Sequence, residues 1–245
     1  MAEPLPIGVL ISGGGTNLQA LIDRSADGSM PARIALVISN KADAYGLTRA
    51  REAGIPTLVI DHRQFNGREP FERAMVKALD HAGVRLVCLA GFMRVLSPYF
   101  IQNFNGRLLN IHPSLLPAFP GLHVQRQAIE AGVRFSGATV HYVSEEVDAG
   151  PIVIQAVVPI LPEDDENTLA TRILKQEHRI YPLAVTLHAQ DRLRIEGRRV
   201  RILDAPSQPD AALLNPPGME FSTRITPHDI HPDARAPETD RGKPS

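Results

Sequence analysis

The sequence is poor in the features that mark several classes of protein. Its 245 residues include one cysteine, Cys88, within the apolar run 84–90, which excludes a disulfide framework and a cysteine-based metal site and predicts a buried strand residue. No two histidines have the His-x-x-x-His spacing of a zinc-binding helix, so we expect no metal. The formal net charge is −1 without a run of Lys or Arg, and we therefore expect no nucleic-acid partner.

Long hydrophobic runs are also missing. No apolar stretch reaches the length that crosses a bilayer, and the N-terminus lacks a basic segment followed by an apolar run. We therefore expect a cytoplasmic protein without a membrane partner, and the sequence leaves open whether it is a monomer or a homodimer. With 43% hydrophobic and 22% charged residues, the chain can bury the core of one large α/β domain or of two small ones.

Short apolar runs alternate with amphipathic segments in the first 90 residues. This pattern is typical of βαβ units and of a mainly parallel sheet. The strand that ends this part of the chain is apolar throughout, which predicts that both faces of the sheet are covered. The pattern predicts strands over residues 7–11, 34–39, 58–60 and 85–90, and helices over residues 18–24, 46–53 and 70–82.

The alternation changes after residue 90. The predicted fold class is α/β, with a Rossmann-like, mostly parallel twisted sheet flanked by helices and an antiparallel C-terminal part. One domain is expected over residues 1–204. Eight of the 21 prolines fall within residues 205–245, where apolar residues are few, so this segment is expected to be irregular or disordered. The later elements are a strand at 108–111, a helix at 124–132, an antiparallel pair at 138–143 and 152–158, a helix at 167–190 that Pro182 should kink, and a hairpin of strands 193–196 and 199–202.

The loop Ser-Gly-Gly-Gly-Thr-Asn at residues 12–17 stands between the first predicted strand and the first predicted helix. Free backbone N–H groups and the helix dipole favour an anion there, and the glycines allow it to approach closely. No acid follows the second strand to hold the ribose of a dinucleotide, and no Gly-Lys-Ser/Thr marks a nucleoside triphosphate site. We favour a phosphate monoester as the ligand; a glycine-rich turn that binds nothing is the alternative.

Residues 110–117 read Asn-Ile-His-Pro-Ser-Leu-Leu-Pro. In an extended segment, residues two apart point to the same side, so Asn110 and His112 can face one small volume. An amide N–H and a protonated imidazole can both donate to an oxygen that gains charge during acyl transfer, and histidine can carry a proton near neutral pH. The alternative is structural, with Asn110 closing a turn and His112 a satisfied loop residue.

Two carboxylates are further candidates. Asp148 lies in the acidic loop 144–150, which is either functional or a solvated turn. Glu177 falls on the apolar face of the long predicted helix, where an ionised group is costly unless it is paired. Either Arg172, Lys175 or another protein cation neutralises it, or the ammonium group of a substrate does.

Several of these segments together closely resemble the phosphoribosylglycinamide formyltransferases, the folate-dependent enzymes of purine synthesis. The resemblance covers residues 7–204. The motif at 110–117 alone marks the wider 10-formyltetrahydrofolate family, whereas the glycine loop with Gln-Glu-His selects the glycinamide ribonucleotide member. The segments are Ser-Gly-Gly-Gly-Thr-Asn-Leu at 12–18, Ser-Asn-Lys at 39–41, Ala-Gly-Phe-Met-Arg at 90–94, residues 110–117 with Pro120-Gly121, and Gln-Glu-His at 176–178 with Tyr181-Pro182.

The resemblance implies formyl transfer from the co-substrate 10-formyltetrahydrofolate to the amine of 5′-phosphoribosylglycinamide, without a metal. Asn110 and His112 would donate to the oxyanion, and Asp148 would serve the proton path. The N-terminal half would bind phosphate and the C-terminal half folate. Leu174 stands where some relatives have a polar residue near the phosphate, a contact that Lys175 could supply. The implied contacts are Gly15, Thr16 and Asn17 to the phosphate, Glu177 to the amine, and Arg68, Phe92, Met93, Arg94, Val95, Leu96, Asn110 and Asp148 to the folate, with Ile101 and Leu108 as apolar walls.

Three other functions share part of this pattern. A formyltetrahydrofolate deformylase would use the same Asn, His and Asp to deliver water, but it resembles a chain with an extra N-terminal regulatory domain, and here the first strand is predicted to begin at Ile7. Methionyl-tRNA formyltransferase needs a C-terminal RNA-binding domain, for which the proline-rich segment has too few core residues. A non-catalytic phosphosugar-binding domain would leave Asn110, His112 and Asp148 unexplained.

Overall fold

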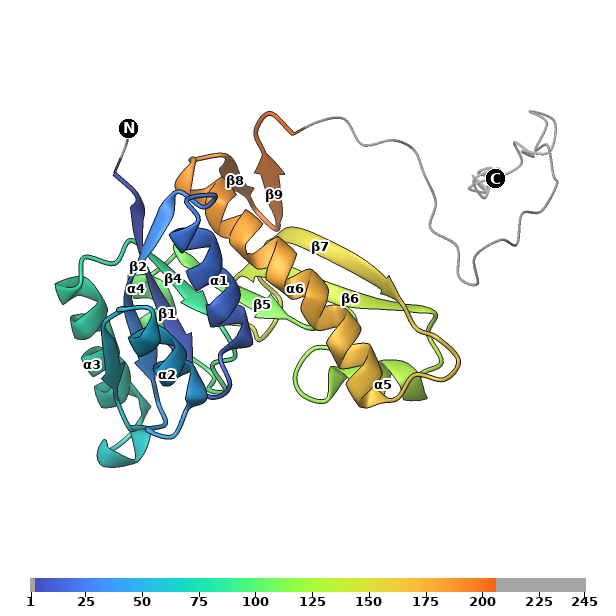
Figure 1. The fold of residues 1–245 in the computed structure, drawn as a ribbon, viewed down its shortest axis with the longest axis horizontal. Coiled ribbons are helices and arrows are strands. Elements are labelled where there is room, and N and C mark those ends of the chain that lie inside the picture. The colour runs from blue at the N-terminus through green and yellow to red at the C-terminus, as the bar shows by residue number, and fades with distance from the viewer. Residues whose placement is uncertain (1–2, 206–245) are drawn as a thin grey trace, which may run out of the picture. The chain divides into compact units, whose positions relative to one another are not determined.

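Nine strands form one sheet in residues 3–205, the part of the chain that the computed structural model describes (Figure 1). The strands are β1 (Leu5–Ile11), β2 (Ala32–Ser39), β3 (Thr57–Val59), β4 (Leu86–Leu89), β5 (Leu108–His112), β6 (Phe135–Tyr142), β7 (Ile152–Pro159), β8 (Leu193–Glu196) and β9 (Arg199–Ile202). Their order in the sheet is β3-β2-β1-β4-β5-β6-β7-β9-β8. The helices are α1 (Thr16–Ala26), α2 (Tyr45–Glu52), the 3-10 helix η1 (His62–Gln64), α3 (Arg68–His81), α4 (Pro98–Asn103), α5 (Val124–Glu130) and α6 (Glu166–Ala189).

Helices cover both faces of the sheet, as the sequence predicts. In β1, Ile7, Val9 and Ile11 belong to a core cluster with residues of α1, α2, α5 and α6, whereas Leu10 belongs to a second cluster with residues of α3 and α4. This division follows from the alternation of side chains along a strand. Strand β4 is buried throughout, and burial raises the pKa of the Cys88 thiol to about 12, so this residue packs as a small apolar side chain.

The winding of the sheet reverses at β1. This strand pairs in parallel with β2 on one side and with β4 on the other. The chain therefore leaves the C-terminal ends of β1 and β4 in opposite directions. In open α/β sheets a ligand site lies in the crevice at such a point.

The C-terminal half of the sheet is antiparallel, as the sequence predicts. Strand β6 pairs antiparallel with β5 and with β7, and the hairpin β8–β9 has the predicted bounds. The sequence does not predict that β9 joins the same sheet, through a parallel pairing of Ile152 with Arg199. The register sets Asn110 of β5 opposite His141 of β6, which brings two polar side chains to one place.

Two short elements were not predicted. Helix α4 has six residues and η1 has three, and neither is long enough to carry a periodic apolar pattern. Helix α6 continues through Pro182. Apart from Ala205, the predicted irregular segment 205–245 lies outside the described residues. Within residues 3–205, no helix is long and apolar enough to cross a membrane.

Gly15 fixes how α2 packs against the glycine loop. It caps the N-terminus of α1 with φ 69° and ψ 35°, in the left-handed region. A Cβ at this position would lie 2.7 Å from the Cα of Gly46 in α2, and the Gly46 N–H donates to the Gly13 carbonyl at 3.0 Å. The backbones of loop and helix are thus in direct contact, which a side chain at Gly15 would prevent.

We expect Gly15→Ala to lower the free energy of unfolding by about 2–5 kcal/mol, because the left-handed conformation costs about 1–2 kcal/mol and the overpacking about 1–3 kcal/mol. Urea denaturation would measure the change. Gly14→Ala is a matched control, since its Cβ would meet no atom within 4 Å. A similar loss of stability in both variants would contradict this account.

Candidate active site

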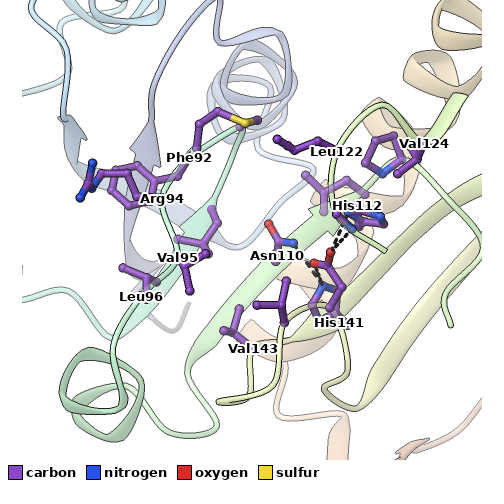
Figure 2. A pocket seen from close by; sticks show the side chains of 18 of the residues that line it. Phe92, Arg94, Val95, Leu96, Asn110, His112, Leu122, Val124, His141 and Val143 are labelled. Atoms are coloured by element: carbon purple, nitrogen blue, oxygen red, sulfur yellow. Dashed lines mark hydrogen bonds and ion pairs between the residues drawn. The ribbon is translucent and has the colours of Figure 1, made fainter. Parts of the chain in front are cut away.

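A cavity of about 480 Å³ opens at the C-terminal ends of β4 and β5 (Figure 2). Its walls come from the end of β4 with the loop 91–96, from β5 and the segment that leads into α5, and from the end of β6 with the loop that follows it. Ile101 of α4 completes the lining. The cavity therefore lies beside the point where the winding of the sheet reverses. Among the described residues, no group of three or more His, Cys, Asp or Glu could hold a metal ion.

The cavity has an apolar rim. Met93, Val95, Leu122 and Val147 line it and are each more than half exposed. Exposed apolar side chains around a concave site are typical of a surface that binds a largely apolar ligand. The cavity lining includes five residues of the predicted folate loop, Phe92, Met93, Arg94, Val95 and Leu96, and the predicted wall residue Ile101.

Two of the residues predicted to contact folate lie away from this lining. Leu108 is 2% exposed and belongs to the core cluster with residues of α3 and α4. It lies on the same side of β5 as Asn110 and His112, but at the start of the strand, away from the cavity. It is therefore a core residue. Arg68 begins α3 and does not line the cavity.

Asn110 and His112 both line the cavity, as the alternation along β5 predicts (Figure 2). The His112 side chain is 7% exposed, and each of its ring nitrogens faces an oxygen. Nε2 lies 3.0 Å from the Phe119 carbonyl oxygen, and Nδ1 lies 3.5 Å from Oδ2 of Asp148. Since both partners are acceptors, only the doubly protonated ring can donate to both.

Asp148 lies between two imidazole rings. Its Oδ2 accepts from the Gly121 N–H at 2.9 Å and faces His112, while its Oδ1 lies 3.9 Å from Nε2 of His141. The residue has φ 53°, in the left-handed region that is uncommon for side chains other than glycine. Its carboxylate is 11% exposed, so the acidic loop 144–150 turns this acid into the cavity instead of leaving it in solvent.

His141 is a site residue that the sequence reasoning missed. It is 2% exposed and lines the cavity opposite Asn110, whose Nδ2 lies 3.1 Å from its Nε2. Its Nδ1 faces the Tyr142 carbonyl oxygen at 3.0 Å, and burial lowers its pKa. A neutral ring with the proton on Nδ1 satisfies both contacts. The sequence predicts strands at 108–111 and 138–143, and pairing them in the correct antiparallel register would have placed His141 opposite Asn110.

The glycine loop lies on the other side of the reversal point and meets Glu177. Asn17 Nδ2 donates to Glu177 Oε2 at 2.6 Å, although the two residues are 160 positions apart. Glu177 is 6% exposed, and burial raises the pKa of its carboxyl group, partly opposed by the bond from Asn17. The sequence left two alternatives, a protein cation or the ammonium group of a substrate, and Arg172 is not that cation: it binds Asp164, with Nη2 at 2.8 Å from Oδ1. Within residues 3–205, no ion pair reaches Glu177.

Known proteins identify the family. Residues 6–185 match the model of the Formyl transferase family, and the chain belongs to this family. Within this family, the chain is similar to phosphoribosylglycinamide formyltransferases over nearly their whole length. The enzyme of that name from Haemophilus influenzae is 48% identical over 209 residues, which are 85% of this chain and 98% of that protein. The crystal structure of glycinamide ribonucleotide transformylase 1 from Symbiobacterium toebii has a TM-score of 0.82 at 55% identity, covering 83% of this chain and 96% of that one.

Some relatives are much longer. The trifunctional purine biosynthetic protein adenosine-3 of Drosophila melanogaster is 56% identical over 183 residues, which are 74% of this chain and 14% of that protein. The chain thus corresponds to a small part of the trifunctional relative.

The burial of Glu177 makes a prediction about stability. Burial raises the pKa of the Glu177 carboxyl group in the folded state above its value in the unfolded chain. Below the unfolded-state pKa the group is protonated in both states and does not oppose folding. As the pH rises through the folded-state pKa, the buried carboxylate ionises and lowers the free energy of unfolding. We therefore expect Glu177→Gln, which keeps an acceptor for Asn17, to raise the melting temperature at pH 8 and to have little effect at pH 4. A variant less stable than wild type at pH 8 would show that the carboxylate is stabilising. Glu163→Gln, at an exposed position, is the control.

Proposed function

We propose that this protein transfers the formyl group of 10-formyltetrahydrofolate to the amine of 5′-phosphoribosylglycinamide, a step of purine synthesis. The observation that carries the proposal is the convergence of Asn110, His112 and Asp148 in a cavity with an apolar rim, beside a glycine loop and a buried carboxylate. Family membership and the similarity to enzymes of this name support it. We assign the activity to residues 1–204, in the cytoplasm. The glycine loop of the N-terminal half binds the phosphate, and both halves contribute to the folate cavity, which corrects the expectation that the C-terminal half alone binds folate.

The glycine loop suits the phosphate of the substrate. Gly15, Thr16 and Asn17 stand at the N-terminus of α1, where backbone N–H groups and the helix dipole favour an anion. The first turn of α1 contains no acidic residue that would oppose the phosphate. We assign the phosphate to these amides. Leu174 has no polar group to offer the phosphate, so the neighbouring Lys175 is the candidate for a further phosphate contact.

Glu177 suits the substrate amine. A buried carboxylate with no ion pair in the described residues is costly, and an ammonium group would offset that cost. Its bond to Asn17 joins the amine site to the phosphate site, and the buried Oδ1 of Asn17 has no partner within residues 3–205. Phosphate and amine would therefore be held by neighbouring groups of the protein, with the amine directed towards the cavity.

In the reaction, the amine nitrogen forms a bond with the formyl carbon, and the carbonyl electron pair moves to oxygen. Asn110 has two N–H groups on Nδ2, and one that is not used by His141 can donate to this oxyanion. Protonated His112 is the second donor through Nδ1–H, which lies 3.5 Å from Asp148 and can turn to the oxyanion, whereas Nε2 stays on the Phe119 carbonyl. Each donor contributes about 3 kcal/mol in comparable oxyanion holes. Asp148 favours the protonated ring and helps the amine proton reach N10 of the folate as the carbon–N10 bond breaks. No covalent enzyme intermediate is needed.

The apolar cavity suits the pterin ring. Phe92, Met93 and Leu96 give apolar contacts, and the backbone groups of Arg94 and Val95 have no hydrogen bond among the described residues. Polar edges of the pterin can pair with these groups. Arg68, at the start of α3, is proposed for the glutamate tail, which extends outside the cavity.

The first test measures whether folate turnover depends on the amine. Purified protein is mixed with 10-formyltetrahydrofolate, and tetrahydrofolate release is followed with and without 5′-phosphoribosylglycinamide. We expect turnover only with the amine, because the phosphate loop and Glu177 bind a phosphorylated amine. Equal turnover in both reactions would favour the deformylase instead.

The second test separates the two carboxylates. Asp148→Asn keeps size and hydrogen bonding but removes the charge that favours protonated His112, so kcat should fall by at least about 100-fold, on the order of 3 kcal/mol. Binding of both substrates should change little. Glu177→Gln should weaken 5′-phosphoribosylglycinamide binding and leave the affinity for a folate analogue unchanged.

Glu146→Gln is the control for this comparison, since Glu146 lies in the same acidic loop but is exposed and outside the cavity lining. Calorimetry and single-turnover kinetics give the two readouts. If Asp148→Asn loses substrate affinity while its single-turnover rate stays near that of wild type, the proton-path role is wrong.

A further inference from the structure

Ser12 connects the two halves of the site. It follows β1 directly and is the first residue of the glycine loop, yet its N–H and its hydroxyl are both bonded within the protein. Its N–H donates to the Gly91 carbonyl at 3.1 Å, and its hydroxyl donates to Asn40 Oδ1 at 2.6 Å and accepts from the Met93 N–H at 2.9 Å. Ser12 and Asn40 are 5% and 3% exposed. A buried series of hydrogen bonds thus links the ends of β2, β1 and β4.

The direction of these bonds gives Asn40 a role. A serine hydroxyl has one proton and two lone pairs, and here the proton goes to Asn40. A lone pair of the hydroxyl oxygen is thereby turned to the Met93 N–H. Met93 belongs to the loop 91–96 after β4, which we call the cavity loop. Without the amide oxygen of Asn40, the hydroxyl could rotate and the Met93 amide would lose its oriented acceptor.

The cavity loop is held at its other end as well. The Ser97 N–H donates to Glu72 Oε1 at 2.8 Å, and the Ser97 hydroxyl also binds this carboxylate. Glu72 is fully buried. Between the two anchors, Arg94 and Val95 keep free backbone groups along the cavity. The position of these groups is therefore set by contacts outside the cavity.

We propose that Ser12, oriented by Asn40, is a positioning residue that fixes the Met93–Val95 backbone for the folate ring relative to the glycine loop. This inference rests on the proposed function, because it takes the cavity to hold the pterin. Ser12 touches neither substrate in this account. It sets the distance between the edge that holds the formyl donor and the loop that holds the acceptor, and in an active site a misplacement of about 1 Å lowers the rate strongly.

The first measurement needs no ligand. In Ser12→Ala the Met93 amide loses its acceptor while the Glu72 anchor remains, so its hydrogen exchange, followed by NMR, should become at least tenfold faster. Ser39→Ala is the matched control: Ser39 is a buried serine at the end of β2 whose hydroxyl bonds only to Lys41. Unchanged exchange at Met93 in Ser12→Ala would overturn the proposal.

The second measurement is calorimetry on the full chain with 5,8-dideazafolate, which carries no formyl group, and with 5′-phosphoribosylglycinamide. Ser12→Ala should weaken binding of the folate analogue about tenfold and change binding of the amine less than twofold. Asn40→Ala should act in the same direction more weakly, and Ser12→Thr, which keeps the hydroxyl, should stay within threefold of wild type.

Equal weakening of both ligands, or folate binding within twofold of wild type in Ser12→Ala, would overturn the proposal. Wild-type protein that does not bind the folate analogue would instead refute the proposed function, and this inference with it. The two failures are distinguished because the positioning role of Ser12 can fail only where the wild-type protein binds the folate analogue.

Discussion

The reversal of winding at β1 is the constraint on which the rest of the structure depends. Parallel strands that pair on both sides of β1 send their following segments apart, so the ends of β1 and β4 are left without a crossing helix between them. Every group assigned to the reaction stands near this gap. The glycine loop follows β1, the cavity loop follows β4, and the Asn110–His112 pair ends β5.

The carboxylates of the site are held by N–H donors and histidine rings instead of by Arg or Lys. Asp148 accepts from the Gly121 N–H and faces two rings, and Glu177 accepts from the Asn17 amide. A permanent Arg or Lys partner would neutralise these acids and leave them little attraction for a ligand. Arg172, one of the cations considered for Glu177, is occupied by Asp164, whose pKa it lowers to about 2. A buried carboxylate without a cationic partner destabilises the folded protein, and binding of the substrate amine can offset this destabilisation.

The sequence predicted those contacts whose residues lie close together in the chain, and missed those that depend on strand register or on helix packing. Asn110 and His112 are two residues apart in one strand, so the period of a strand was enough to place them together. His141 needed the register of β5 with β6, which a pattern of apolar residues does not define. Likewise, Glu177 was found by its position on the apolar face of α6, but its partner Asn17 is 160 residues away, and only packing of α1 on α6 brings them together.

The two histidines of the cavity show how partners outside the reaction set the chemistry within it. Both rings are almost fully buried and lie near the same carboxylate. His112 faces an acceptor at each nitrogen, which only the imidazolium can satisfy, whereas His141 faces one acceptor and the Asn110 amide donor, which the neutral ring satisfies. A neutral His141 avoids repulsion between two imidazolium groups near Asp148. It also keeps Asn110 turned with its amide, and not its carbonyl, towards β6, so the second N–H of that amide stays available to the oxyanion. In the proposed mechanism, the role of Asn110 as a donor therefore depends on the protonation state of His141.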